Sequence, residues 1–319
     1  MRVVVTGGTG YLGSAIVRAL ARSGHTPVVF SRHASDAGLP GDAVDGDVRD
    51  RAAVTRAVPG ADAVCHAAAL VSVWRARPVE FDDVNVEGLR TVLDVCREMR
   101  TPRIVYTSSF LALPPAGRSA PLAANDYQRT KARAHAVAQD AAESGLPVIS
   151  LVPGVIYGPG AGTEGNLIGR LIRDHLAGTL PGIIGADCKW SYAQIDDVAE
   201  AHVSAITKGR VGQTYALGGE NAPQMRVFEI VRELTGRPLP RRIPYAVAWA
   251  GALVEEARAR LTGRAPLLTR GVVEIFRHDW SMDSARSLAE LSYRVSPLGE
   301  GVRALLAGHD RGPDFAARV

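Results

Sequence analysis

A tyrosine and a lysine stand four positions apart in the segment Tyr127-Gln128-Arg129-Thr130-Lys131. On a helix this spacing places both side chains on one face, one turn apart. An ammonium group beside a phenol lowers the pKa of the tyrosine from about 10 towards neutral pH, so the tyrosine can exchange a proton with a substrate oxygen. Eight tyrosines and three lysines in 319 residues give about 0.08 such pairs by chance. The pattern therefore favours a catalytic pair over a solvated surface pair.

Hydroxyl groups follow one of the apolar runs, in the segment Tyr106-Thr107-Ser108-Ser109-Phe110. We expect this segment at the carboxyl end of a parallel strand, where side chains face the ligand crevice of a doubly wound sheet. A hydroxyl there could hydrogen-bond the reacting oxygen of a substrate. Ser109 is the preferred candidate and Ser108 the alternative, although serines at strand ends also cap local turns.

A glycine-rich turn opens the chain, between an apolar run at 2–6 and a helical pattern from residue 11. Glycines at positions 7, 10 and 13 allow a tight turn, a close approach of a pyrophosphate to the backbone, and close packing of helix on sheet. An ordinary βα turn could share the bare pattern, but the strand before it and the helix after it favour a dinucleotide site. The predicted cofactor-binding residues here are Gly7, Thr9, Gly10, Tyr11, Leu12 and Gly13.

The end of the second apolar run bears on the choice between NAD and NADP. An NAD site usually has an Asp or Glu at this point to accept hydrogen bonds from the ribose 2′-hydroxyl. The sequence has Ser31 and Arg32 instead, and a guanidinium group can pair with a 2′-phosphate. We therefore expect NADP, with NAD possible, and the alternative is that Arg32 is one of many solvated arginines.

The order of the elements predicts an α/β fold. Apolar runs at 2–6, 27–31, 63–66, 103–108 and 147–152 alternate with helical patterns at 11–23, 50–58, 85–100 and 125–144. Strands that are apolar throughout and separated by helices are typical of a parallel sheet covered on both faces. Further along we expect a helix at 166–177, a loop around Lys189, a helix at 196–208, a strand at 213–217 and then only helices.

These elements indicate a Rossmann-type, doubly wound parallel sheet with a smaller C-terminal α/β substrate-capping domain. We expect the NAD(P)-binding domain to comprise residues 1–155, with residues 191–218 returning to it. The substrate-binding domain would comprise 156–190 and 219–319.

The composition excludes several classes of protein. With 46% hydrophobic and 22% charged residues the chain is globular. A net charge of +4 without a long basic run gives nucleic-acid binding little support. The longest apolar stretch, 243–254, is shorter than the ~20 residues needed to cross a bilayer, so we expect a core or interfacial helix and no membrane span. No signal peptide is indicated at residue 1.

The cysteines and histidines indicate neither a disulfide framework nor a metal site. Cys65, Cys96 and Cys188 form no CxxC pair, and the histidines show no HxH or HxxxH spacing. A reducing, cytoplasmic location is the simplest interpretation.

Other polar residues have local structural explanations. His66 ends an apolar run and is interpreted as structural. We expect Asp196 and Asp197 to cap the helix that they begin. Asn85 has two possible roles that the sequence does not separate. It could cap another helix, or it could hold a water molecule for proton transfer.

Together these motifs resemble the extended short-chain dehydrogenase/reductase family. The similarity covers about residues 1–295 and includes Gly46-Asp47-Val48, His66-Ala67-Ala68-Ala69, Pro153-Gly154-Val155-Ile156-Tyr157-Gly158 and Ile195-Asp196-Asp197-Val198. The resemblance implies that Tyr127 is the general acid/base and that Lys131 holds the nicotinamide ribose. It also implies that the remaining cofactor contacts come from Asp47, Val48, Ala67, Ala68, Ala69, Pro153, Gly154 and Val155.

Within this family the sequence is most similar to dihydroflavonol-4-reductase-like reductases and farnesol-dehydrogenase-like proteins. In nucleotide-sugar epimerases an arginine contacts the nucleotide where this chain has Trp190, and another precedes the Pro-Gly segment where it has Val152. The loss of both charges favours an uncharged, apolar substrate. The residues expected to line its pocket are Trp74, Phe110, Tyr157 and Trp190.

The sequence thus predicts an NADP(H)-dependent oxidoreductase that transfers hydride between the nicotinamide and a carbonyl or alcohol of an apolar small molecule. The alternatives are a nucleotide-sugar epimerase or dehydratase and a non-catalytic NADP-binding redox sensor. Relatives pair the helices at 85–100 and 125–144 across a two-fold axis. Leu89, Leu93, Ala134 and Ala138 on these helices suggest a homodimer.

Overall fold

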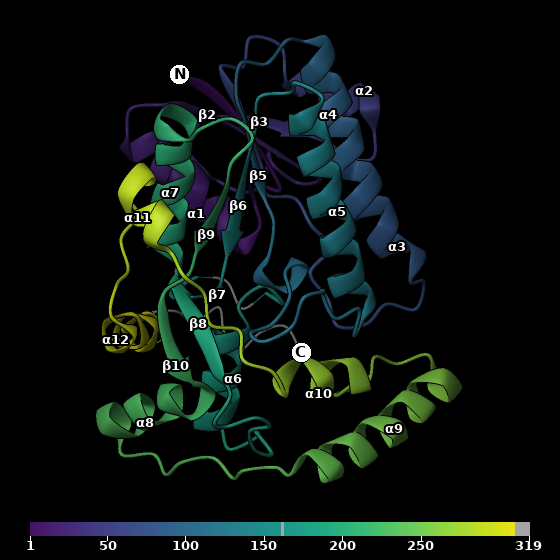
Figure 1. Cartoon of the computed structure of the whole chain (residues 1–319), viewed down its shortest axis with the longest axis vertical. Coiled ribbons are helices and arrows are strands. Elements are labelled where there is room, and N and C mark those ends of the chain that lie inside the picture. The colour runs from purple at the N-terminus through teal and green to yellow at the C-terminus, as the bar shows by residue number, and fades with distance from the viewer. Residues whose placement is uncertain (161–162, 310–319) are drawn as a thin grey trace.

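The computed structural model describes residues 1–160 and 163–309 (Figure 1). Its main sheet has seven strands in the order β3-β2-β1-β4-β5-β6-β9, and all neighbouring strands are parallel. The order reverses at β1, which lies between β2 and β4, so the ligand crevice opens at the carboxyl end of β1. The strands are β1 (Arg2–Thr6), β2 (Thr26–Ser31), β3 (Asp42–Asp45), β4 (Ala63–His66), β5 (Ile104–Thr107), β6 (Val148–Pro153) and β9 (Thr214–Leu217).

Helices cover both faces of this sheet (Figure 1). One face carries α1 (Tyr11–Arg22) and α7 (Ile195–Lys208), which pack against each other. The other carries α2 (Arg51–Ala57), α4 (Gly88–Glu98) and α5 (Asp126–Glu143). Strands covered on both sides are apolar without alternation, which is the pattern that the sequence shows. The predicted doubly wound, Rossmann-type sheet is confirmed.

A second, smaller sheet has the strand order β10-β8-β7. It consists of β7 (Val155–Tyr157), β8 (Lys189–Gln194) and β10 (Glu220–Pro223), with β7 parallel and β10 antiparallel to β8. A separate apolar core joins it to α6 (Leu167–Leu176), α8 (Gln224–Thr235) and α12 (Leu298–His309).

Four strands differ from the sequence-based expectation, and one of them is β7, for which no strand was predicted. The loop expected around Lys189 is wrong, because Lys189 begins β8 and residues 190–193 are buried on both sides. The expectation of only helices after residue 217 is also wrong, because β10 follows there. Strand β3 was not predicted. Short, exposed edge strands such as β3 and β10 lack the apolar run on which the prediction depended.

Two helix starts also differ. The helix expected at 85–100 begins earlier, as α3 (Val79–Asp82) and a π-helical turn, η1 (Asp83–Glu87), so Asn85 is not a cap. Helix α7 is capped by Gln194, whose side chain accepts hydrogen bonds from the backbone N–H groups of Asp196 and Asp197. The expected capping by those two aspartates is therefore wrong.

The chain crosses between the two sheets more than once. Helix α11 (Ala285–Leu291) packs against α7 and β9 of the main sheet, and Leu291 and Tyr293 lie in its core. Residues close to the end of the described chain thus belong to the apolar core between the main sheet and helices α1 and α7. The domain limits stay a prediction.

The side chains that suggested a dimer lie inside the protomer. Leu89, Leu93, Ala134 and Ala138 are buried between α4, α5 and the sheet. Apolar residues at these positions therefore fill the core, and they carry no argument for a dimer.

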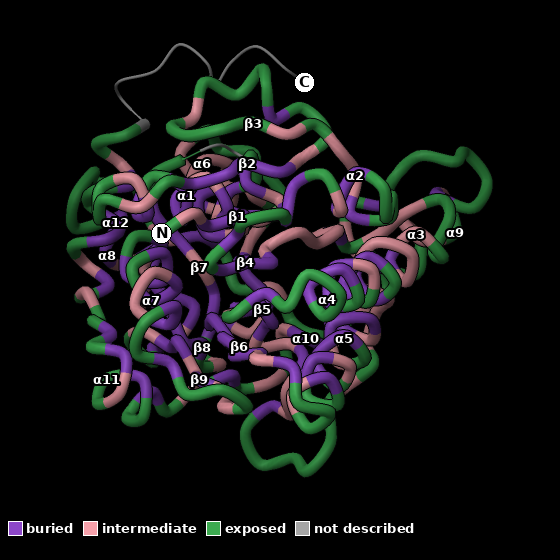
Figure 2. Tube along the Cα trace, turned by 90° about the horizontal axis from the view of Figure 1, so that it is seen from above, coloured by how far each residue is buried: buried purple, intermediate pink, exposed green. Residues whose placement is uncertain are grey.

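The apolar stretch at 243–254 forms most of α9 (Tyr245–Thr262), which packs on α10 (Arg270–Phe276) at the edge of the molecule (Figure 1). Figure 2 shows much of α9 as exposed. Among the described helices none combines the length and apolarity needed to cross a membrane.

Candidate active site

Helix α5 presents Tyr127 and Lys131 on one face, as predicted. The side chain of Asn125 accepts a hydrogen bond from the backbone N–H of Gln128 at 2.8 Å, which fixes the start of the helix two residues before the tyrosine. The side chain of Arg129 on the same turn binds Asp82 with both terminal nitrogens. The first turn of α5 is therefore held in place from two sides.

Ser109 and Tyr127 face each other. Ser109 follows the carboxyl end of β5, and its hydroxyl interacts with the phenol, which lowers the tyrosine pKa. Burial acts more strongly in the opposite direction, so the net pKa of Tyr127 lies above its usual value. The predicted lowering of the Tyr127 pKa by Lys131 is therefore wrong. Ser109 also accepts a hydrogen bond from the backbone N–H of Leu111 and so caps the short helix η2 (Phe110–Ala112).

Ser108 points elsewhere. Its hydroxyl is buried near the phenol of Tyr106 and lowers the pKa of that residue. The two serines are neighbours, but on extended backbone their side chains point in opposite directions. Only Ser109 is therefore placed beside Tyr127.

Lys131 is buried and pairs with no carboxylate among the described residues. Its Nζ atom donates a hydrogen bond to the backbone oxygen of Thr107 at 2.9 Å and lies 5.2 Å from the centre of the Tyr106 ring. Burial lowers the pKa of Lys131 to about 7. An isolated ammonium in such a place is costly unless a ligand pairs with it.

A buried histidine fixes the carbonyl group that Lys131 contacts. His202 Nδ1 donates to the backbone oxygen of Val198 at 2.8 Å, so Nε2 accepts from the Thr107 hydroxyl at 2.9 Å. Burial lowers the pKa of His202 to about 4, which keeps the ring neutral in this arrangement. The sequence analysis missed His202, because only the fold brings α7 beneath β5.

The glycine-rich loop fits a dinucleotide. Gly7 has a φ of +70°, and a Cβ there would lie 2.7 Å from the backbone of Ala68. A Cβ at Gly13 would lie 2.0 Å from the Gly7 carbonyl oxygen, so α1 approaches the turn as closely as glycine allows. No side chain caps α1 at Gly10, and its first turn carries no acid. Its free N–H groups thus suit a diphosphate. Thr9 lies within the turn, and Tyr11 and Leu12 are the first two residues of α1.

Arg32 lies exposed at the end of β2, without a hydrogen-bond or ion-pair partner among the described residues. The nearby carboxylates are engaged elsewhere. Asp47 binds Arg49 through both oxygens, at 2.9 and 2.7 Å, and Asp45 binds Ser35. The Ser31 hydroxyl is buried and has no hydrogen-bond partner among the described residues. The charge of Arg32 helps to lower the pKa of Asp47, after the larger effect of Arg49. The end of β2 therefore presents an exposed cation that no carboxylate binds directly. Val48 is buried beside Asp47.

The remaining predicted cofactor residues lie at the carboxyl ends of β4 and β6. The loop of Ala67, Ala68 and Ala69 follows β4 and is tied to β1 through the hydrogen bond from Ala67 N to Thr6 O. Pro153 ends β6, Val155 begins β7, and Gly154 between them would bring a Cβ within 2.5 Å of the Ser191 carbonyl oxygen.

Asn85 connects the alanine loop to the catalytic helix. Its side chain accepts a hydrogen bond from the backbone N–H of Leu70 at 2.7 Å and donates one to the Thr130 hydroxyl at 3.0 Å. Thr130 lies one turn along α5 from Asp126 and donates to its carbonyl oxygen. Asn85 therefore fixes the position of the loop after β4 relative to helix α5.

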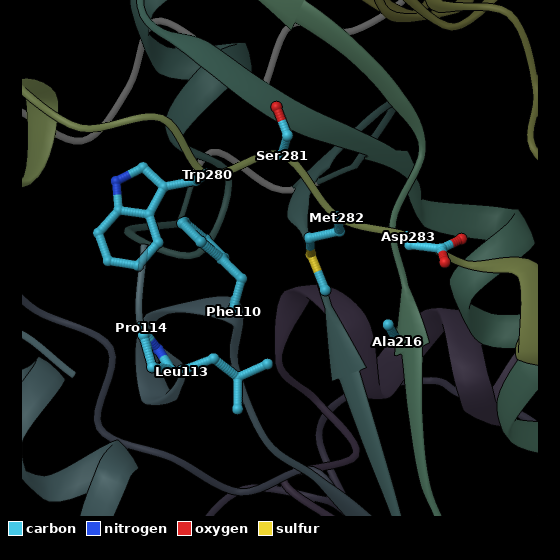
Figure 3. Close-up of a pocket in the computed structure, with 8 residues that line it drawn as sticks. All are labelled: Phe110, Leu113, Pro114, Ala216, Trp280, Ser281, Met282 and Asp283. Atoms are coloured by element: carbon cyan, nitrogen blue, oxygen red, sulfur yellow. The ribbon is translucent and has the colours of Figure 1, made fainter. Parts of the chain in front are cut away.

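A hollow of about 250 Å³ opens beside Phe110, which follows Ser109 in the chain, and its lining is partly apolar and partly polar (Figure 3). The rings of Phe110 and Trp280 meet edge to face, and their centres are 5.4 Å apart. Trp280 and Met282 were not among the pocket residues predicted from the sequence. The lining residues are Phe110, Leu113, Pro114, Ala216, Trp280, Ser281, Met282 and Asp283.

The other predicted pocket residues divide into two groups. Trp74 lines a second hollow, together with Asn125 and Asp126 at the start of α5. Trp190 and Tyr157 are buried in the core of the smaller sheet. Trp190 packs behind Phe110, with ring centres 6.1 Å apart, so it can act on a ligand only through Phe110.

His66 is structural in its contacts, as expected. Its Nδ1 shares a hydrogen bond of 2.9 Å with the Thr6 hydroxyl, and burial lowers its pKa to about 3. Within residues 1–160 and 163–309 no group of histidine, cysteine and acidic side chains could hold a metal ion.

Known proteins of similar sequence belong to a family that binds the same kind of cofactor as this site suggests. The NAD dependent epimerase/dehydratase family matches residues 3–218. The chain is 34% identical to sterol demethylase protein B of Methylococcus capsulatus, covering 91% of this chain and 93% of that protein. It is 31% identical to the 2-alkyl-3-oxoalkanoate reductase of Stenotrophomonas maltophilia, covering 96% of this chain and 99% of that protein.

A solved structure has the same fold and a bound dinucleotide. The UDP-glucose 4-epimerase of Thermus thermophilus in complex with NAD superposes with a TM-score of 0.76 at 25% identity, covering 98% of this chain and all of that one. The chain belongs to the NAD-dependent epimerase/dehydratase family of extended short-chain dehydrogenases/reductases. It is an NAD(P)-dependent oxidoreductase.

Proposed function

We propose that this protein is an NADP(H)-dependent reductase or dehydrogenase that interconverts a carbonyl group and a secondary or allylic alcohol on an apolar small molecule. The observation that carries the proposal is the interaction of Ser109 with Tyr127, together with the hollow beside Phe110, the residue that follows Ser109. The hydroxyl groups thus lie where an apolar molecule could present an oxygen.

Each side chain has a separate part in this reaction. When bound, the nicotinamide supplies or accepts the hydride. Tyr127 gives a proton to the carbonyl oxygen in reduction and takes it back in oxidation. Ser109 donates a hydrogen bond to the same oxygen. Lys131, whose charge has no carboxylate partner among the described residues, holds the nicotinamide ribose through its hydroxyl groups. Proton transfer from a positioned tyrosine typically contributes ~10²–10⁴ in rate.

The lining of the hollow supports an apolar substrate. Phe110, Leu113, Trp280 and Met282 supply apolar surface, and Asp283 is the single charged side chain among its lining residues. The names of the two relatives above refer to a sterol and to an alkyl oxoalkanoate, which are molecules with extended apolar parts. A sterol-, terpenoid- or flavonoid-like carbonyl fits both features.

The exposed guanidinium of Arg32 supports NADP over NAD, as do the direct contacts of Asp47 with Arg49 and of Asp45 with Ser35. The structural neighbour named above binds NAD, so NAD stays the alternative cofactor. A homodimer built on α4 and α5 and a cytoplasmic location also stay predictions. Light scattering of the purified protein would decide the first of these.

One experiment tests the reaction. Purified protein is mixed with NADPH and a panel of sterol, terpenoid and flavonoid ketones, and the loss of absorbance of NADPH is followed. We expect turnover with at least one apolar ketone, and we expect the Tyr127→Phe variant to lose at least ~10² in turnover while still binding NADPH. Conversion of UDP-sugars with no net use of NADPH would instead identify an epimerase. Binding of NADPH with no turnover of any substrate would identify a sensor.

A further inference from the structure

The outward face of α9 is apolar along its length. Val247, Leu253, Val254 and Leu261 are 60%, 46%, 67% and 88% exposed. A helix turns 100° per residue, so these four positions share one side with Ala246, Ala250 and Ala257, which are also exposed. The side facing the protein carries small residues instead, with Ala248 and Ala252 packed on Val273 of α10. No described residue covers the outward face.

This arrangement is the reverse of an ordinary surface helix, which turns polar residues to solvent. The acidic side chains of α9 are not free. Glu255 pairs with Arg258 at 2.7 Å, and Glu256 pairs with Arg270 at 2.9 Å. Trp249 lies at the side of the helix with Arg270 over its ring. An exposed apolar face of this kind marks an interaction site.

The free charges around the apolar face are all positive. Residues 241–264 contain five arginines and two glutamates, and both glutamates are paired as described above. The side chains of Arg241, Arg260 and Arg264 are exposed and have no hydrogen-bond or ion-pair partner among the described residues. They lie before the start of the helix and around its end. The face thus combines apolar surface with flanking cations.

We propose that α9 docks on a lipid bilayer surface containing anionic lipids, with the helix lying in the plane of the interface. Apolar side chains enter the boundary between headgroups and acyl chains, and the arginines meet the phosphates. The helix is 18 residues long and only part of it is apolar, so it lies on the membrane without crossing it. This inference does not depend on the proposed reaction.

Charge favours a lipid surface over a second copy of the chain. A two-fold contact places the same patch on both sides of the interface. The unpaired arginines would then face one another, which repels, whereas phosphates of anionic lipids would pair with them.

Docking on this side has a geometric consequence. One flank of α9, at Glu256 and Arg260 beside the apolar face, borders the hollow that Trp74 and Asp126 also line. Tyr127 is the next residue in the chain. A docked helix would therefore hold this hollow close to the membrane surface.

Flotation of the full chain with vesicles tests the proposal. We expect binding to vesicles of phosphatidylcholine mixed with phosphatidylglycerol, weaker binding to phosphatidylcholine alone, and weakening by salt. Leu253→Glu should lower the bound fraction roughly tenfold or more, because it places a charge in the apolar face. Leu288→Glu is the matched control, since Leu288 is also a helical leucine and is 47% exposed, but lies on α11.

Several results would overturn the proposal. One is wild-type protein that does not float with the mixed vesicles. Another is a Leu253→Glu variant that folds, as shown by an unchanged melting temperature, and floats as the wild type does. A third is an assembly, seen by light scattering, that Leu253→Glu dissociates, because a second copy would then cover this face. Val254→Glu serves as an independent second variant, and Arg264→Gln should reduce the preference for the anionic lipid.

Discussion

The Nζ atom of Lys131 donates its hydrogen bond to the main-chain oxygen of Thr107, whose side chain is in turn fixed by His202. The lysine is therefore held by a neutral carbonyl group and not by a carboxylate. No carboxylate pairs with it within residues 1–160 and 163–309, and burial brings its pKa down to about 7.

This arrangement makes stability depend on pH. The pKa of Lys131 is about 7 in the folded protein and 10.5 otherwise, so between these values the unfolded chain binds more protons. Stability then rises with pH, by up to about 1.4 kcal/mol per pH unit from this group. We expect the unfolding free energy of the wild type to increase relative to Lys131→Met between about pH 7 and 9 in denaturant titrations without cofactor. The comparison cancels the titration of buried cysteines and tyrosines. Parallel curves would contradict the lowered pKa.

The two neighbouring serines provide a matched pair. Ser109→Ala removes the hydroxyl that faces Tyr127, and we expect a loss of roughly 10² in kcat, as for other donors to a reacting oxygen. Ser108→Ala removes a hydroxyl that faces Tyr106 and should leave kcat within a few-fold of wild type. Steady-state kinetics on the substrate found in the NADPH screen would check both. If Ser108→Ala is the more damaged variant, the roles are reversed.

The choice of cofactor can be tested by exchanging charges. Ser31→Asp with Arg32→Ala adds a carboxylate beside the ribose and removes the exposed cation, so like charges would repel a 2′-phosphate. We expect wild type to prefer NADPH roughly ten- to hundredfold in kcat/KM, and the double variant to prefer NADH. Equal kcat/KM for both cofactors in the wild type would show that Arg32 points away from the nucleotide.

The close approach of α1 to the glycine turn can be tested with a single methyl group. A Cβ at Gly13 would lie 2.0 Å from the Gly7 carbonyl oxygen, whereas a Cβ at Gly299 in α12 would meet nothing within 4 Å. We expect Gly13→Ala to lower both the melting temperature and the affinity for NADPH, the latter at least roughly tenfold, because the turn must shift. Gly299→Ala should leave the affinity unchanged. Calorimetric titration measures the binding, and wild-type affinity in Gly13→Ala would refute the argument.

Local patterns could be predicted from the sequence, whereas long-range burial could not. The spacing of Tyr127 and Lys131 and that of the glycines depend on one helix or one turn each, so the pattern is sufficient. Trp190 was expected in a pocket, but it is buried behind Phe110 by contacts with residues far along the chain. The pairing of Thr107 with His202 joins residues that are 95 positions apart. No local signal contains such contacts.

The strand at the far edge of the main sheet has a consequence for synthesis of the protein. Strand β6 pairs with β9, and the chain forms the smaller sheet's β7 and β8 between them. On the ribosome the N-terminal half therefore emerges with the edge of β6 unpaired, and it stays so until residue 217 has been added. Such an edge invites pairing with other nascent chains. The nucleotide-binding half thus matures late, only after much of the other half has been made.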